Sequence, residues 1–134
     1  MTVEIKNMLG KTILVYNGEN LVNANLKHKN LTGVDFRNLD LTGINLERAH
    51  CRGGDFSGAI LKNAYMPYGQ FMEAKFIGAD FEDADIERAN FSNAILTGAK
   101  FEKIGRDFRA RFDGATLPDG TVGQTTNDKE VGDD

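Results

Sequence analysis

Large apolar residues recur at every fifth position between Leu21 and Phe101. The seventeen positions of this series are Leu21, Leu26, Leu31, Phe36, Leu41, Leu46, Cys51, Phe56, Leu61, Met66, Phe71, Phe76, Phe81, Ile86, Phe91, Leu96 and Phe101. With 40% hydrophobic residues in the chain, chance would produce such a series with a probability of about 10⁻⁷. A second series, two positions earlier, carries small residues: Ala24, Ala49, Gly54, Ala59, Ala64, Gly69, Ala74, Ala79, Ala84, Ala89, Ala94 and Ala99.

A period of five fits neither of the ordinary secondary structures. Five residues turn an α-helix by about 500°, so its apolar face would drift by about 140° per repeat. In a flat strand an odd period would send successive large side chains to opposite faces. The chain must therefore bend after each repeat. A bend of about a right angle would bring both series onto one axis and close a coil with four repeats.

Three consecutive segments show the repeat in its most regular form: Ala79–Asp83, Ala84–Arg88 and Ala89–Asn93. They resemble the A(D/N)LXX unit of the pentapeptide-repeat family. The resemblance covers residues 19–103. It implies an all-β fold, a right-handed quadrilateral parallel β-helix with N- and C-terminal caps, and its hand agrees with the general preference of parallel crossovers. Seventeen repeats correspond to about four coils.

The interior of this predicted β-helix is filled by side chains. Residues twenty apart stack, so large residues form four columns on the axis with small residues between them, and no room is left for a ligand. Cys51 lies in one of these columns, which favours a core residue over a redox thiol. Larger residues or Lys replace the small one at Lys29, Val34, Leu39 and Ile44, so we expect the first coils to be wider or imperfect.

Both ends of the repeat are predicted to be covered. Residues 1–18 form an N-terminal cap, in which Lys11 to Tyr16 is a strand that pairs with Val3 to Ile5. After Phe101 the rhythm breaks and returns at Phe112 with one residue inserted. We therefore assign residues 104–117 to a C-terminal cap, a turn or short helix with Phe108 as its plug.

Composition and charge narrow the class of protein. The chain has 134 residues, enough for one domain. Its formal net charge of −4 arises within residues 118–134, which contain one lysine, Lys129, and five Asp or Glu residues. We read this segment as a mobile acidic tail. The chain has no apolar run of membrane length, and its first ten residues do not resemble a secretory signal, so we expect a cytoplasmic protein.

No arrangement of residues in the sequence indicates catalysis. His28 and His50 fall at outward positions on different sides of the solenoid, and neither belongs to a triad or a metal motif. We predict no catalytic residue, no metal site and no cofactor, and hence no enzyme.

Five carboxylates cluster in the eight residues from Asp80 to Glu87: Asp80, Glu82, Asp83, Asp85 and Glu87. Such a cluster is compatible with a mimic of a phosphate backbone or with a cation site. Stacking places lysines beside it, with Asp80 next to Lys100, Asp83 next to Lys103 and Glu82 next to Lys62. We therefore favour a solvated surface of ion pairs.

A second candidate surface combines aromatic and basic residues, namely Arg48, Tyr65, Pro67, Tyr68 and Arg88. All five are predicted to point outward, with Arg48 and Arg88 on either side of Tyr68. Tyr and Arg are typical of interaction hot spots. The alternative is a cation–π stack within the chain. The sequence leaves both interpretations open.

Two functional hypotheses follow. The first is a non-enzymatic module that binds a protein partner or acts as a scaffold; its partner and biological role are unknown. The second comes from the resemblance, because some members of the family mimic duplex DNA and bind a type II topoisomerase, gyrase. The charge-balanced body counts against it. We expect no direct nucleic-acid binding, no membrane association, and a monomer or weak dimer.

Overall fold

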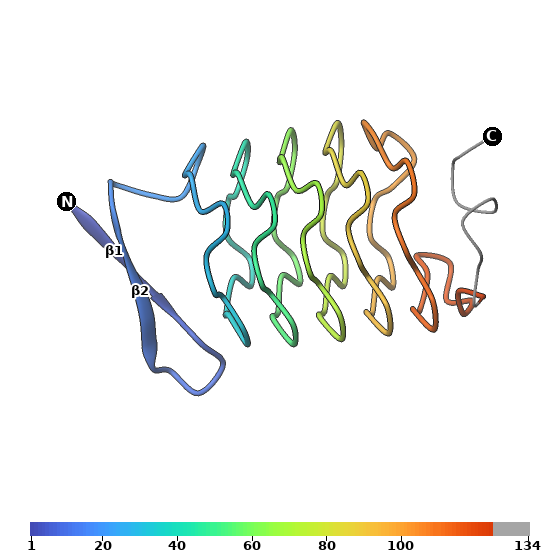
Figure 1. Cartoon of the computed structure of the whole chain (residues 1–134), viewed down its shortest axis with the longest axis horizontal. Coiled ribbons are helices and arrows are strands. Elements are labelled where there is room, and N and C mark those ends of the chain that lie inside the picture. Colours follow the sequence, from blue (N-terminus) through green and yellow to red (C-terminus); the bar gives the residue numbers. More distant parts are fainter. Residues whose placement is uncertain (125–134) are drawn as a thin grey trace.

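The computed structural model describes residues 1–124, which form a β-helix solenoid without any helix. Paired positions of successive coils are twenty residues apart: Asn45 pairs in parallel with Asn25 on one side and with Tyr65 on the other. Four five-residue repeats therefore make one coil. The coils stack along the long axis of the molecule, as Figure 1 shows.

Every repeat from residue 19 to residue 98 ends in a corner with left-handed backbone geometry. Arg48 and Tyr68, for example, have φ of 56° and 60°. An Asp or Asn one position before the large interior residue stabilises many of these corners, because its side chain accepts a hydrogen bond from the amide two residues later. Asp85 Oδ1 accepts such a bond from Glu87 N at 3.0 Å. This local role explains the recurring Asp or Asn of the repeat.

The predicted interior series forms the core. All seventeen of its residues are buried except Phe101, which is half-buried. Phenylalanines of successive coils stack directly: the ring centroids of Phe56 and Phe76 are 4.7 Å apart, and those of Phe71 and Phe91 are 5.2 Å apart. The axis of the solenoid is therefore filled with side chains.

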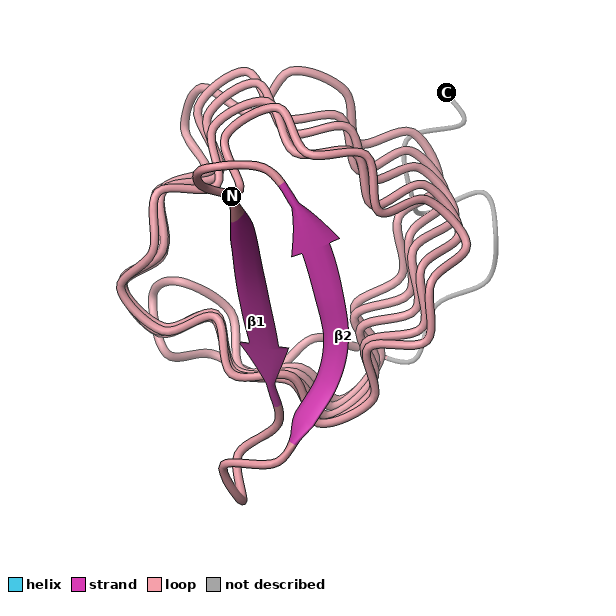
Figure 2. Cartoon of the chain, turned by 90° about the vertical axis from the view of Figure 1, so that its left-hand side faces the viewer, coloured by secondary structure: helices cyan, strands magenta, loops and turns pink. Residues whose placement is uncertain are grey.

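An antiparallel hairpin precedes the coils. Its strands are β1 (Thr2–Lys6) and β2 (Thr12–Asn17), with Val3 paired to Tyr16 and Ile5 to Leu14. This confirms the predicted pairing. The hairpin lies across the N-terminal end of the solenoid, and Figure 2 shows both strands in front of the coils.

The inner face of this hairpin joins the core. Ile5 is buried in it, and Val3, Leu14 and Tyr16 pack against it. Beyond β1, Asn7 forms an antiparallel bridge with Val34 in the first coils. The hairpin is thus connected to the solenoid by both side chains and backbone.

The predicted irregularity of the first coils is present at two positions. Lys29 and Leu39 are exposed, whereas Val34 and Ile44 are fully buried. Leu39 lines an apolar surface hollow of about 310 Å³ together with Val3 and Leu21. Where a larger residue replaces the small residue of the repeat, it is buried inside the coil at Val34 and Ile44 and exposed at Lys29 and Leu39.

The last coil confirms the one-residue insertion. Its pairs are twenty-one residues apart, as in Asp85 with Arg106 and Asn90 with Arg111. Phe112 consequently stacks on Phe91, with ring centroids 5.4 Å apart. The insertion shifts every outer side chain of this coil by one position relative to a strict period of five.

The prediction for Phe108 was wrong. Phe108 does not plug the end of the core; its ring lies outside, against the guanidinium groups of Arg88 and Arg109 at 5.5 and 5.3 Å. The register places Phe108 at the outer position equivalent to Glu87, because Arg88 N donates to Phe108 O as Tyr68 N donates to Glu87 O. Phe101, Ile104, Phe112 and Leu117 pack against the core in its place.

Residues 118–124, which the sequence places in the acidic tail, hydrogen bond to the last coil. Leu117 N donates to Thr121 O at 2.7 Å, and Gly123 N donates to Ala115 O at 2.7 Å. The rest of the predicted tail, residues 125–134, lies outside the described part of the chain.

Candidate functional site

The outer walls are the surfaces available for function, because the axis is filled by the core. The hollows on these walls are shallow and open to solvent, with volumes of about 230 to 370 Å³. Among residues 1–124 no helix has the length and apolar character needed to cross a bilayer. Within the same residues, no three His, Cys, Asp or Glu side chains are grouped as metal ligands.

One wall carries a column of stacked arginines and aromatic rings. The guanidinium carbon of Arg48 lies 4.3 Å from the ring centroid of Tyr68, and that of Arg88 lies 6.0 Å from the same ring. Arg88 and Arg109 contact the next ring, Phe108. We call Arg48, Tyr68, Arg88, Phe108 and Arg109 the Arg–aromatic ladder. Each contact lies within the range of a cation–π interaction.

Backbone register places these side chains above one another. Arg48 N donates to Pro67 O, Tyr68 N to Glu87 O, and Arg88 N to Phe108 O, at 2.8 to 3.0 Å. Arg48, Tyr68 and Arg88 occupy equivalent corners of successive coils, all with positive φ. The column is therefore set by the repeat itself.

Arg48 and Arg88, the two arginines on either side of Tyr68, differ from most other arginines of the chain in having no ion pair within the described residues. Four arginines form ion pairs with carboxylates: Arg37 with Asp35, Arg52 with Glu73, Arg106 with Asp85 and Glu87, and Arg111 with Asp113. Arg48 and Arg88 have no ion pair or side-chain hydrogen bond with any residue in the described part of the chain. Both residues are exposed.

The other two members of the predicted contact patch lie differently from each other. Tyr65 is 44% exposed, as expected, in the column between Asn45 and Asp85. Pro67, which was expected to take part in the contact surface, is buried and offers little area to a partner. Glu47 and Glu87 occupy the same position in the neighbouring coils, and both are half-buried.

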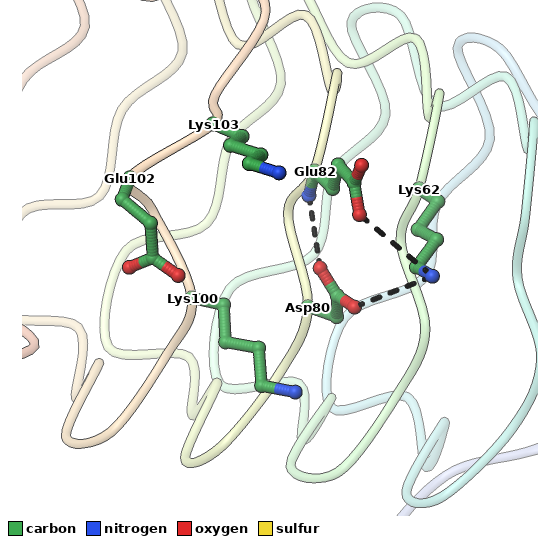
Figure 3. Close-up of a pocket in the computed structure, with 6 residues that line it drawn as sticks. All are labelled: Lys62, Asp80, Glu82, Lys100, Glu102 and Lys103. Atoms are coloured by element: carbon green, nitrogen blue, oxygen red, sulfur yellow. Dashed lines mark hydrogen bonds and ion pairs between the residues drawn. The ribbon is translucent and has the colours of Figure 1, made fainter.

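The acidic cluster forms a surface of mixed charge. The predicted pair of Lys62 and Glu82 is confirmed at 3.7 Å, and Lys62 also lies 3.9 Å from Asp80. Figure 3 shows these groups in a hollow of about 230 Å³ that three lysines and three carboxylates line: Lys62, Asp80, Glu82, Lys100, Glu102 and Lys103. The hollow is therefore electrically balanced.

Two predicted ion pairs are not formed. Asp80 is bridged to Lys100, and Asp83 N donates to Lys103 O at 2.7 Å, but these are backbone contacts. No ion pair joins their side chains within residues 1–124. Adjacent backbones do not suffice, because long lysine side chains have several other directions open to them.

The sequence analysis missed the partner of Asp85 and Glu87. Arg106 lies 3.8 Å from Asp85 and 3.1 Å from Glu87. A spacing of twenty would have placed Gly105 beside Asp85, whereas the insertion places Arg106 there. The signal was the eleven-residue interval between Phe101 and Phe112, which also accounts for Phe108 and Arg109 in the ladder.

The remaining chemically reactive side chains do not form a site. His28 and His50 are exposed and belong to different columns of the solenoid. Cys51 is fully buried, and this burial raises the pKa of its thiol far above the usual value. A protonated, inaccessible thiol is a poor nucleophile, so Cys51 acts as a core residue.

Comparison with known proteins agrees with this architecture. The family model for pentapeptide repeats matches eight copies, over residues 20–50, 40–76 and 70–102. The crystal structure of the pentapeptide repeat protein Rfr23 from the cyanobacterium Cyanothece 51142 is similar, with 28% identity and a TM-score of 0.60 over 74% of the chain. The chain spans 63% of the length of that structure.

Two further solved structures are similar. A pentapeptide repeat protein from the thylakoid lumen of Arabidopsis thaliana has 25% identity and a TM-score of 0.56, over 79% of this chain and 85% of its own. QnrB1, a plasmid-mediated fluoroquinolone resistance protein, has 19% identity and a TM-score of 0.53, over 71% of this chain and 46% of its own. This last likeness concerns the fold alone. No curated protein matches the sequence.

Proposed function

The chain belongs to the pentapeptide repeat family, and from this premise we propose that it is a non-enzymatic module that binds a partner protein through one wall of its solenoid. The contact surface we assign consists of Arg48, Tyr65, Tyr68 and Arg88. Pro67 is buried and is therefore left out of this surface.

The observation that carries the proposal is that Arg48 in the Arg–aromatic ladder is stacked on a ring but has no ion pair within residues 1–124. Arg48 is stacked 4.3 Å from the ring of Tyr68. Its charge has no carboxylate partner among residues 1–124. Ordered arginine and tyrosine side chains on an exposed wall are the residue types that dominate protein interfaces. Tyr68 and Tyr65 are 41% and 44% exposed, which leaves area to bury.

The arrangement of the core supports a binding role over catalysis. Enzyme pockets are concave, and they gather titratable groups that act together. Here stacked phenylalanines such as Phe56 and Phe76 occupy the axis. The two histidines lie in separate columns. Recognition by the shape and charge of an outer wall fits such a molecule better.

We also infer the finer geometry of the fold. The coil is right-handed and quadrilateral, since parallel crossovers are right-handed in nearly all proteins and each coil contains four repeats. The hairpin of β1 and β2 serves as the N-terminal cap, and residues 104–117 serve as the C-terminal cap. Both would protect strand edges that otherwise invite association. The protein is then a monomer or weak dimer, which sedimentation velocity tests.

Affinity capture with matched variants tests the proposed contact surface. Wild-type protein, Tyr68→Ala and the control Ile77→Ala are used as baits in an extract of the source cells, and captured proteins are quantified by mass spectrometry. Ile77 is 45% exposed, close to the 41% of Tyr68. We expect at least one protein to be captured by the wild type and the control but depleted at least fivefold by Tyr68→Ala. Identical capture by all three baits would refute the proposal.

The DNA-mimic hypothesis has weaker support. A mimic of duplex DNA needs a continuous negative surface. In this chain four of the five clustered carboxylates have a cationic neighbour, since Lys62 pairs with Asp80 and Glu82, and Arg106 pairs with Asp85 and Glu87. A gyrase supercoiling assay separates the two hypotheses. We expect no inhibition or protection at micromolar protein, and a clear effect would reverse the ranking.

A further inference from the structure

Resting on the proposed function, we propose that the partner presents an acidic polypeptide segment to the Arg–aromatic ladder. Two of its carboxylates would bind the guanidinium groups of Arg48 and Arg88. The chain between them would cross the exposed edge of Tyr68. The ligand is thus an acidic, extended peptide.

The unmet charge of the two arginines indicates an anionic ligand. A guanidinium has five N–H donors in a planar fork that fits a carboxylate. Elsewhere on the chain such forks are occupied, as in Arg37, which binds Asp35 through two hydrogen bonds of 2.9 and 3.0 Å. Arg48 and Arg88 make no such bond with any residue in the described range. A partner carboxylate would complete them.

Stacking prepares these arginines for binding. The guanidinium carbon of Arg88 lies between two rings, 6.0 Å from the ring centroid of Tyr68 and 5.5 Å from that of Phe108. A free arginine loses side-chain entropy when it is immobilised. Arg48 and Arg88 have lost part of that freedom already, so less affinity is lost when a ligand binds. Phe108, far from being a plug of the core, restricts Arg88 on the side away from Tyr68.

The spacing of the arginines suggests the form of the segment. Arg48 and Arg88 are two coils apart, which corresponds to about 10 Å at the usual distance between neighbouring strands. Every third residue of a polyproline II chain points the same way, at intervals of about 9.3 Å. An extended segment with a carboxylate at every third position therefore matches the two arginines.

The neighbouring charges favour a polypeptide over a nucleic acid. Glu47 and Glu87 come directly before Arg48 and Arg88 in the chain. Arg106 offsets the charge of Glu87, whereas Glu47 has no ion pair within the described residues. A nucleic acid brings a negative charge with every nucleotide and would meet this carboxylate. A peptide can place its carboxylates only where the arginines are.

A titration followed by NMR tests the inference on the full chain. The probe is a twelve-residue peptide of four Glu-Pro-Pro units, with a Gln-Pro-Pro peptide and a twelve-nucleotide thymidine oligomer as comparisons. We expect the Glu peptide to shift the Nε–H resonances of Arg48 and Arg88 and to bind at least tenfold more tightly than the Gln peptide. The thymidine oligomer should bind more weakly than the Glu peptide. Equal binding of both peptides, or preferential binding of the oligomer, would overturn the inference.

Substitutions in the ladder provide the second arm. We expect the double variant Arg48→Gln/Arg88→Gln to weaken binding of the Glu peptide at least tenfold. Arg52→Gln is the matched control, because Arg52 is exposed but already paired with Glu73 at 2.9 Å. Circular dichroism verifies that the variants fold. Equal loss of binding in the control, or no loss in the double variant, would contradict the assignment.

Failure of the inference is distinguishable from failure of the proposed function. If Tyr68→Ala abolishes partner capture while Arg48→Gln/Arg88→Gln does not, the wall binds a protein but its ligand is not acidic, and only the inference fails. If neither change affects capture, the proposed contact surface itself is wrong.

Discussion

Asn23 lies against Gly43 of the next coil so closely that a Cβ atom on Gly43 would be 1.9 Å from Asn23 Oδ1. Asn38 and Gly58 repeat the relationship, at 2.1 Å. Both glycines have positive φ, 70° and 72°. Residues such as Arg48 adopt the same backbone conformation at other corners, so glycine is favoured here by its positive φ but required by the side chain stacked against it.

This relationship predicts different effects for two similar substitutions. Gly53 has φ of 69° but no atom within 4 Å of the place where a Cβ would lie. Gly53→Ala should therefore cost only the conformational strain, about 1 to 2 kcal/mol of unfolding free energy. Gly43→Ala should cost about 1 kcal/mol more, because Asn23 must move. Urea unfolding measures both, and equal costs would contradict the stacking of Asn23 on Gly43.

The stacked core predicts a large loss of stability on truncation at its centre. The ring centroid of Phe76 lies 4.7 Å from that of Phe56, in a near-parallel stack, and 5.6 Å from that of Phe71, in an edge contact. We expect Phe76→Ala to lower the unfolding free energy by about 3 to 5 kcal/mol. The adjacent exposed Ile77→Ala should change it by less than about 0.5 kcal/mol. Chemical denaturation of the two variants would expose an error if their effects were similar.

Burial predicts that Cys51 is unreactive in the folded protein. Desolvation raises the pKa of its thiol, so the thiol stays protonated at neutral and mildly alkaline pH. A disulfide reagent should modify it only as fast as the protein unfolds, and Cys51→Ala should leave partner capture unchanged. Rapid modification under native conditions would show that this column of the core opens to solvent.

One ion pair predicts a pH dependence of stability. Hydrogen bonds from Arg37 lower the pKa of Asp35 below its usual value. A carboxylate with a lowered pKa stabilises the folded state above its unfolded pKa of about 3.9, and this contribution disappears as the pH falls through the folded value. The difference in stability between wild type and Asp35→Asn should therefore be present at pH 7 and vanish near pH 2. An unchanged difference across this range would contradict the assignment.

The repeat and the core could be predicted from the sequence because both follow from one period. Positions such as Phe56 and Phe76 need no knowledge of the rest of the chain once every fifth residue is known to face the axis. The hairpin was also predictable, since the run of β-branched and apolar residues within residues 11–16 is a local property.

Other features depend on contacts between neighbouring coils and could not be predicted from a strict five-residue period. The burial of Pro67, for example, does not follow from the period, which places this residue at an outer position. Arg106 and Phe108 occupy their positions because one inserted residue shifts the whole last coil. The predicted pair of Asp83 and Lys103 failed for another reason, because close backbones do not determine where a long side chain points.

Site-specific photo-crosslinking tests the central claim, recognition by the ladder wall, most directly. A photoreactive phenylalanine analogue replaces either Tyr65, beside the Arg–aromatic ladder, or Ile77; these residues are 44% and 45% exposed. We predict a discrete crosslinked protein from position 65 that is absent from position 77 and is lost when Arg48→Gln/Arg88→Gln is added. Equal crosslinking from both positions, or none from position 65, would contradict the claim.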